Sequence, residues 1–286
     1  MADLDTLVSD IYSLLEGKLV GDDSVLEKFG PELGKVFAKR FSSSREERVP
    51  TLRMSNIGRP LRQLWYELNG YKAEEISGKT LLKFSYGDLT ESLVLVLAEV
   101  AGHSVSDFQK EIEVDGIKGH IDAIVDGVLV DVKSCSPYSF AKFENGTLLE
   151  AGNDSFGYCH QLSGYAHALN LPAAWIAFNK QSGEICVLHL PKEKIEEYDV
   201  QNRIKTCREA IKQAEPPERC YEPEPDGKSG NLKLSVPCSY CGWKFECHKD
   251  ANDGEGIKVY SYSTGPRFLV KVTREPKVFP LKQESN

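Results

Sequence analysis

Two aspartates and a lysine between residues 119 and 133 could together bind a metal ion and act on a phosphate ester. The dipeptide Asp126-Gly127 separates two runs of β-forming residues, and Asp-Gly in this setting predicts a two-residue hairpin turn of type I′. Such a turn fixes the register of the hairpin, so Asp122 falls opposite Asp131. Lys133 lies two residues beyond Asp131 and therefore projects from the same face.

Two opposed carboxylates have no obvious role in folding. Like charges that face each other on neighbouring strands repel, with Cβ atoms roughly 4.5–5.5 Å apart. Mg²⁺ takes one or two carboxylates as hard oxygen ligands and leaves room for water and phosphate oxygens. The pattern therefore predicts a site for Mg²⁺ or Mn²⁺ with Asp122 and Asp131 as ligands, and the alternative is a solvated hairpin face.

Four short motifs, in order along the chain, resemble the PD-(D/E)XK nuclease superfamily. Within it they are most similar to the RecB-like exonucleases, the branch that includes CRISPR-associated and phage enzymes. The motifs are Gly87–Glu91, Gly119–Ile124, Asp131–Lys133 and Gln161–Tyr165. The resemblance covers residues 55–190 and implies an α/β, restriction-endonuclease-like core with a mixed central sheet flanked by helices. An N-terminal helical segment and a small cysteine-rich C-terminal segment would be added to this core.

The resemblance also implies the ligands of the catalytic metal. Glu91 and the carbonyl of Val132 would join Asp122 and Asp131 around Mg²⁺ or Mn²⁺. For Glu91 the alternative is a structural one, since the residue is expected to open a helix over 85–100, where the helix dipole favours a carboxylate.

Three further residues receive catalytic roles from the same resemblance. Lys133 would orient or deprotonate the attacking water and offset phosphate charge. Gln161 and Tyr165 are four residues apart and share one face of a helix, from which they would orient Lys133 or the phosphate. Ordinary packing on the helix surface is the alternative for this pair.

Hydrophobic periodicity indicates the elements that must position these residues. Helices are expected over 4–19, 55–68, 85–100, 158–170 and 192–214, and strands over 108–114, 173–178 and 184–189. A long loop over 134–157 and a linker over 216–230 complete the pattern. The expected division is an N-terminal helical segment (1–50), a nuclease core (51–215) and a C-terminal segment of linker, cysteine-rich knot and β-like tail (216–286).

Composition is that of an ordinary globular protein, with 286 residues, 41% hydrophobic and 27% charged. No apolar run is long enough to span a bilayer, and the first residues lack the features of a secretory signal. Eight cysteines without such a signal favour a reducing cytoplasm over a disulfide framework. This would be a bacterial cytoplasm, or that of the host if the protein comes from a phage.

The net charge of −8 hides a basic stretch. Residues 35–62 contain eight lysines and arginines against two glutamates. Affinity for phosphates depends on local cations rather than on the charge of the whole protein. We therefore expect DNA contacts from Arg53, Arg59 and Arg62, and the alternative is a solvated surface with ordinary basic residues.

A cysteine-rich knot near the C-terminus has the spacing C-x₂-C-x₅-C. It resembles the three-cysteine tail of cluster-bearing RecB-like nucleases, in which an upstream cysteine completes the set. Here no cysteine precedes Cys135, so the fourth ligand would be Cys220 or His248. Structural Zn²⁺ is preferred over an iron–sulfur cluster, and a metal-free remnant is the alternative. The three knot cysteines are Cys238, Cys241 and Cys247.

Taken together, the motifs predict a metal-dependent DNA exonuclease that acts on single-stranded or duplex DNA ends. One alternative is a structure-specific or restriction-type endonuclease on the same core. The other is a DNA-binding subunit that has lost catalysis, against which the complete set of candidate catalytic residues argues. DNA is the expected partner, and no membrane association is expected.

Overall fold

The computed structural model describes residues 3–27, 31, 34, 38 and 49–281. The chain divides into two compact units, one of residues 1–59 and 76–206 and one of residues 60–75 and 207–286. These units cut across the three segments expected from the sequence, because residues 60–75 group with the C-terminal residues.

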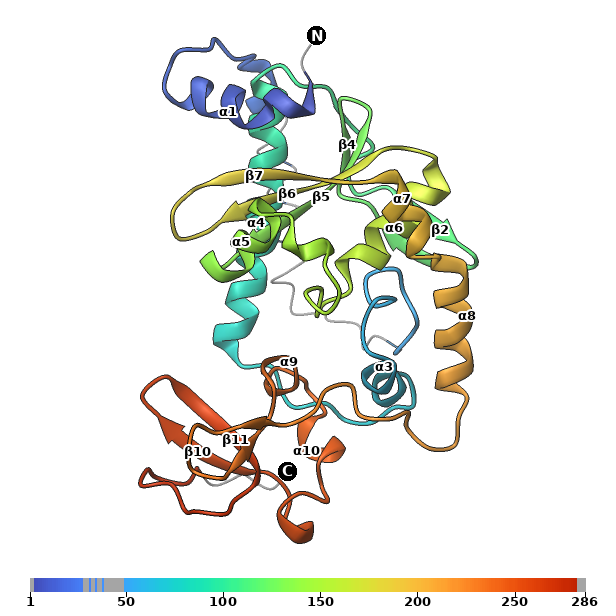
Figure 1. Cartoon of the computed structure of the whole chain (residues 1–286). Coiled ribbons are helices and arrows are strands. Elements are labelled where there is room, and N and C mark those ends of the chain that lie inside the picture. Colours follow the sequence, from blue (N-terminus) through green and yellow to red (C-terminus); the bar gives the residue numbers. More distant parts are fainter. Residues whose placement is uncertain (1–2, 28–30, 32–33, 35–37, 39–48, 282–286) are drawn as a thin grey trace. The chain divides into compact units, whose positions relative to one another are not determined.

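The first unit contains a five-stranded mixed sheet in the order β1-β4-β5-β6-β7 (Figure 1). Strands β5 and β6 are parallel, and the other neighbouring pairs are antiparallel. Helices lie on both faces of this sheet, which confirms the expected fold class. The strands are β1 (Val105–Ser106), β4 (Ala123–Val125), β5 (Val128–Cys135), β6 (Ala173–Asn179) and β7 (Ile185–Leu190).

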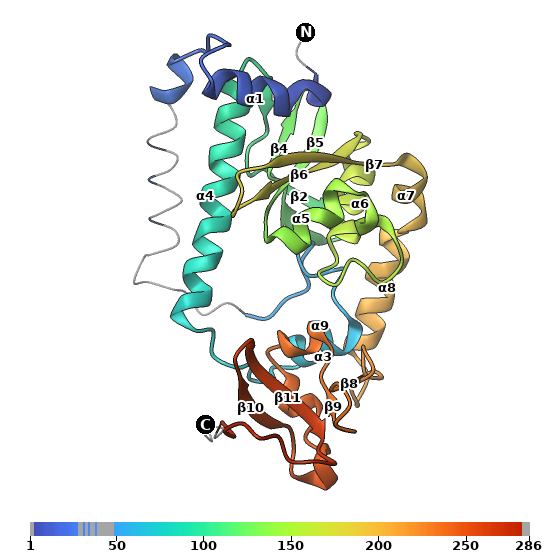
Figure 2. The ribbon, with the colours of Figure 1, turned by 60° about the vertical axis from the view of Figure 1, so that its left-hand side comes forward.

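Alternation along β5 assigns its side chains to two different environments. Val130 and Val132 point into an apolar core, where residues from α1 (Leu7–Leu15) and α4 (Gly78–Val100) cover the sheet. Asp131 and Lys133 point to the other face, because successive side chains of a strand alternate. On that face lie α5 (Pro137–Glu144) and α6 (Tyr158–Leu169), both in the central part of Figures 1 and 2.

The hairpin of β4 and β5 has the expected register. Val125 pairs with Val128 and Ala123 with Val130. Asp126 has a φ of 50° and Gly127 one of 81°, as a type I′ turn requires. A second Asp-Gly turn, at residues 115–116, joins β2 (Glu111–Val114) to β3 (Ile117–His120) in a separate two-stranded sheet.

Several expected elements differ in extent or type. The helix expected over 55–68 begins only at Leu61, after Pro60. The helix expected over 4–19 ends at Leu15, and the strand expected over 108–114 begins at Glu111. Helix α4 begins at Gly78 rather than at 85, since the Ser77 side chain accepts a hydrogen bond from the amide of Thr80. The expected loop over 134–157 contains α5, which Ser136 caps and in which Pro137 occupies the first turn. The expected helix over 192–214 is two helices, α7 (Lys192–Glu197) and α8 (Val200–Ile211), separated near Asp199 with its φ of 28°.

The second unit combines short helices with a small antiparallel sheet. Its core contains Leu234, Ile257, Val259 and Val270. The sheet has the order β10-β11-β9-β8. The elements are α3 (Leu61–Leu68), β8 (Glu224–Pro225), β9 (Leu232–Lys233), α9 (Val236–Ser239), α10 (Lys244–Cys247), β10 (Lys258–Tyr262) and β11 (Gly265–Lys271). In the described part of the chain, no helix has the length and apolar character needed to cross a membrane.

Candidate active site

The two candidate aspartates lie together at the start of the β4–β5 hairpin. Asp131 is on β5 and is buried, with an exposed fraction of 7%. Asp122 lies between β3 and β4, one step beyond the last paired residues, Ala123 and Val130. Its Oδ2 accepts a hydrogen bond of 2.8 Å from the backbone amide of Val132. That bond extends the hairpin and holds the Asp122 carboxylate beside β5.

Lys133 is bound to Asp131. Its Nζ lies 2.7 Å from Oδ1 and 2.6 Å from Oδ2 of that carboxylate. Burial alone would lower the pKa of Lys133, but the carboxylates of Asp131 and Asp122 outweigh it and raise that pKa overall. Lys133 is therefore protonated at neutral pH. Its Nζ also lies 4.8 Å from the ring centroid of Tyr158, a cation–π distance.

Glu91 reaches the site from the middle of α4, so the alternative of a charge at a helix N-terminus is wrong. Its Oε1 accepts a hydrogen bond of 2.5 Å from Nε2 of Gln109. The backbone amide of Gln109 donates to the carbonyl of Asp122 at 3.0 Å. Gln109 thus ties the helix carboxylate to the aspartate segment, a role that no motif indicated. Its φ of 51° is rare for glutamine.

The carboxylates of the site are difficult to ionise together. Burial raises the pKa of Glu91 to about 7, and Asp131 adds to the shift while Gln109 and Lys133 oppose it. Burial also raises the pKa of Asp122 well above its usual range, with further contributions from Asp131 and Glu91. Three ionised carboxylates and one ammonium would leave an excess of two negative charges, which a divalent cation would neutralise.

The ligand atoms of the site are of the kind that Mg²⁺ and Mn²⁺ prefer. The site offers hard carboxylate oxygens from Glu91, Asp122 and Asp131 and an excess of negative charge that the single ammonium of Lys133 does not neutralise. Its chemistry therefore fits a divalent cation. Within the described ranges, no three side chains of His, Cys, Asp or Glu are already arranged as a metal site.

Gln161 and Tyr165 both lie on α6, and Tyr165 packs directly on Gly119. A Cβ atom built on Gly119 would lie 2.0 Å from the Tyr165 hydroxyl oxygen and 2.7 Å from Cβ of Met54. Burial raises the pKa of Tyr165, and Asp131 and Asp122 raise it further, so the hydroxyl lies near the carboxylates. The glycine of one motif and the tyrosine of another therefore form a single packing contact beside the site.

This contact predicts that Gly119→Ala lowers the free energy of unfolding by about 1–3 kcal/mol, because an overpacked side chain must displace Tyr165 or Met54. Gly87→Ala on α4 is the matched control, since its added Cβ would meet no atom within 4 Å. That control should be neutral or stabilising. Chemical denaturation of the variants would measure both effects. A Gly119→Ala protein as stable as the wild type would contradict the contact, and recovery in Gly119→Ala/Tyr165→Phe would support it.

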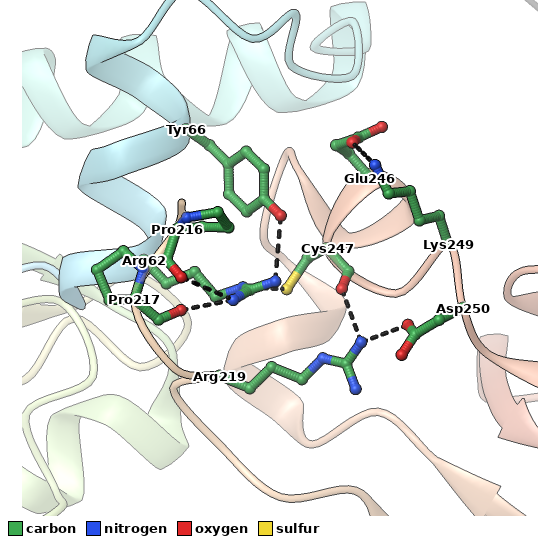
Figure 3. A network of polar contacts seen from close by, with 9 residues as sticks. All are labelled: Arg62, Tyr66, Pro216, Pro217, Arg219, Glu246, Cys247, Lys249 and Asp250. Carbon is green, nitrogen blue, oxygen red and sulfur yellow. Dashed lines mark hydrogen bonds and ion pairs between the residues drawn. The ribbon is translucent and has the colours of Figure 1, made fainter. Parts of the chain in front are cut away.

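The three arginines expected at DNA have different environments. Arg53 and Arg59 are half-buried in the first unit. Arg62 belongs to the second unit, where its Nε donates to Cys247 Sγ at 3.1 Å and its Nη2 to the Tyr66 hydroxyl at 3.3 Å (Figure 3). Its Nη1 donates to the carbonyls of Pro216 and Pro217.

Every nitrogen of the Arg62 guanidinium thus has a partner within the protein. The expectation that Arg62 binds DNA phosphates is not supported, because the side chain fastens residues 216–217 and Cys247 to α3. The basic residues Lys35, Lys39, Arg40, Arg45 and Arg48 lie outside the described residues.

Cys220 and the three knot cysteines are neighbours within the second unit. Burial raises the pKa of the Cys241 thiol to about 11, and the nearby thiols of Cys238, Cys247 and Cys220 add to the shift. His248 is buried, and burial, with Arg219 adding, lowers its pKa to about 4. Cys220 therefore lies close enough to the three knot cysteines to influence Cys241.

Comparisons with known proteins give a distant likeness of fold. No protein-family model matches the chain, and no curated protein sequence does. The crystal structure of SSO0001 superposes with a TM-score of 0.40 at 16% sequence identity and covers 77% of this chain and 94% of that one. The structure of LHK-Exo in complex with dAMP gives a TM-score of 0.36 at 14% identity, covering 62% of this chain and 94% of that one.

Proposed function

We propose that the protein is a deoxyribonuclease that depends on Mg²⁺ or Mn²⁺ and hydrolyses phosphodiester bonds at DNA ends. The observation that carries this proposal is the group formed by Glu91, Asp122 and the buried Asp131 around Lys133. Asp122, Asp131, Glu91 and the carbonyl of Val132 would hold the cation. When bound, such an ion lowers the pKa of a coordinated water and offsets charge on the phosphoryl oxygens.

Side chains of the protein would position the water and stabilise charge on the phosphate. Lys133 keeps its proton at Nζ, so it is suited to orient water and to offset the negative charge that develops on the phosphate. The Tyr165 hydroxyl beside the carboxylates can donate a hydrogen bond to the same phosphate, and Gln161 on the same helix can orient Lys133 or the phosphate. The β4–β5 hairpin holds Asp122 and Asp131 beside Lys133, and so keeps the reacting groups in place.

Exonuclease action is proposed over endonuclease action because the sequence motifs resemble the exonuclease branch. Incubation of the purified protein with end-labelled linear DNA and covalently closed circular DNA, with Mg²⁺ or Mn²⁺, tests this choice. Shortening of linear DNA with circles spared would support it. Efficient cutting of closed circles would favour an endonuclease on the same core. DNA binding without cleavage in either metal would favour a non-catalytic DNA-binding subunit.

We further propose that Cys220, Cys238, Cys241 and Cys247 bind a structural metal ion, Zn²⁺ in preference to an iron–sulfur cluster. The ion would link α9 and α10 to the segment before them, and metal binding would contribute folding free energy. The hydrogen bond from Arg62 to Cys247 would stabilise a thiolate ligand.

Cys241→Ser should therefore lower the thermal stability of the second unit, whereas Cys186→Ser, on β7 of the first unit, is the control and should have a small effect. Elemental analysis of anaerobically purified protein should find about one equivalent of zinc in a colourless protein. A brown protein with visible absorbance would identify an iron–sulfur cluster instead. Zinc and iron both well below one equivalent would contradict a metal site.

A further inference from the structure

An exposed aromatic ring is connected to Lys133 through one other ring. Phe156 has an exposed fraction of 60%. It stacks on Tyr158 with ring centroids 5.5 Å apart and an interplanar angle of 22°. The Tyr158 ring in turn lies 4.8 Å from Nζ of Lys133. One exposed apolar side chain needs no function, but this one continues a stack that begins at the candidate catalytic lysine.

The segment that carries the two rings is held firmly. The side chain of Asp154 accepts hydrogen bonds from the amides of Gly157, Tyr158 and Cys159 at 2.9, 3.0 and 2.8 Å. The backbone of Gly157 also packs on that of Gly58, where a Cβ atom on Gly58 would lie 2.3 Å from Cα of Gly157. The backbone of Phe156 is therefore fixed in a turn just before α6. Little conformational entropy of this segment would be lost when a ligand binds to the ring.

The other side of the Tyr158 stack is occupied by protein. Phe143 on α5 lies 6.3 Å from Tyr158 and 6.2 Å from Trp175 on β6. The aromatic row thus runs from the buried sheet to the surface, and Phe156 is its exposed member. An exposed ring of this kind offers a π face to which a flat ligand can stack.

We propose that Phe156 and Tyr158 form a stacking platform for an unpaired base of a single-stranded DNA end, next to the phosphate that is cleaved. This inference rests on the proposed nuclease function. Every base has a π face, so stacking on an aromatic side chain is tolerant of sequence. Bases within a duplex are already stacked on one another, whereas a single strand can place a free base on Phe156 while its phosphate lies at Lys133.

The test measures the coupling between the ring and a base. Equilibrium binding of labelled single-stranded oligonucleotides, with Ca²⁺ in place of Mg²⁺, is compared for strands that carry one abasic site at successive positions from each end. We expect one abasic position to weaken binding by the wild type by about tenfold. Phe156→Ala should bind the intact strand about tenfold more weakly and should be insensitive to that position. Phe156→Trp should retain the wild-type pattern.

Phe84→Ala is the matched control, because Phe84 is also exposed, at 46%, but lies on α4; its binding should equal that of the wild type. An equal abasic penalty in wild type and Phe156→Ala would overturn the platform, even if DNA is cleaved. An equal loss of affinity for blunt duplex would overturn the single-strand assignment. A third outcome would separate the two proposals. If the penalty of one abasic position depends on Phe156 but the wild type cleaves no DNA in Mg²⁺ or Mn²⁺, the stacking platform would be supported and the nuclease function refuted.

Discussion

Asp131→Asn and Lys133→Met are each expected to lower the rate of DNA cleavage by about a thousandfold or more. Asp131 is the buried carboxylate at the centre of the site, and Lys133 is the ammonium that it binds at 2.6–2.7 Å. Asparagine keeps the shape of aspartate but loses the charge that a cation requires. Methionine keeps much of the length of lysine but cannot offset charge on a phosphate. Single-turnover cleavage of labelled DNA by each variant would measure the loss.

Folding must be separated from catalysis in these variants. Loss of one partner leaves the other buried without its counter-charge, which costs up to about 3–5 kcal/mol. The double variant Asp131→Asn/Lys133→Met removes both charges and should be more stable than either single variant, yet equally inactive. Ser134→Ala, a substitution on the same strand, controls for losses of activity during purification, and this variant should retain activity. A folded Lys133→Met protein with wild-type cleavage would contradict the assigned role of the lysine.

Glu91→Gln is expected to stabilise the metal-free protein at alkaline pH. The folded protein raises the pKa of Glu91 from 4.5 to about 7, so folding takes up a proton between these values. The unfolded state then binds fewer protons than the native state, and stability falls as pH rises from 4.5 through 7. Above pH 8 the buried charge costs up to about 3 kcal/mol. Glutamine removes that cost and flattens this part of the pH dependence.

Denaturant unfolding in EDTA, at pH 5 and pH 8, would measure the difference. Glu99→Gln on the same helix is the control and should follow the wild type. Added Mg²⁺ should stabilise the wild type at pH 8 more than it stabilises Glu91→Gln, because a ligand that binds the native state alone raises stability. Greater stability of the wild type than of Glu91→Gln in EDTA at pH 8 would contradict the raised pKa.

Local signals predicted the centre of the site from the sequence. The Asp126-Gly127 turn fixes the register of its hairpin within two residues, and so a short-range rule was sufficient to bring Asp122 and Asp131 together. That rule alone does not predict how removal of Asp131 affects stability. Repulsion between opposed aspartates suggests that removal of Asp131 is harmless, but its buried ion pair with Lys133 predicts a destabilised protein.

Long-range contacts could not be predicted in this way. Gln109 has no motif, and its role depends on an unusual backbone conformation that places it between Glu91 and Asp122. Arg62 was grouped with basic residues of its own stretch, yet three of its four partners, Pro216, Pro217 and Cys247, are more than 150 residues away in the chain. Charge patterns show which residues can bind phosphate, but only the fold decides which of them are already paired within the protein.

The start of helix α5 could have been predicted from the sequence, although the surrounding residues pointed to a loop. Ser136-Pro137 is a recognisable start of a helix, and it explains why residues of the expected loop form α5. Its signal was weaker than the glycines and asparagines that follow it, and these suggested a loop. The position of Phe143 against Trp175 shows that packing on the sheet favours the helix.

The most direct test of the metal-dependent site is the release of nucleotides from end-labelled linear DNA, measured against the concentration of Mg²⁺ or Mn²⁺. Wild type and Asp131→Asn would be purified identically, and both would be checked for a folded state. We expect release by the wild type that rises with metal concentration and stops in EDTA, and a loss of about a thousandfold or more in Asp131→Asn. Equal rates for the two folded proteins, or no cleavage by the wild type in either metal, would contradict it.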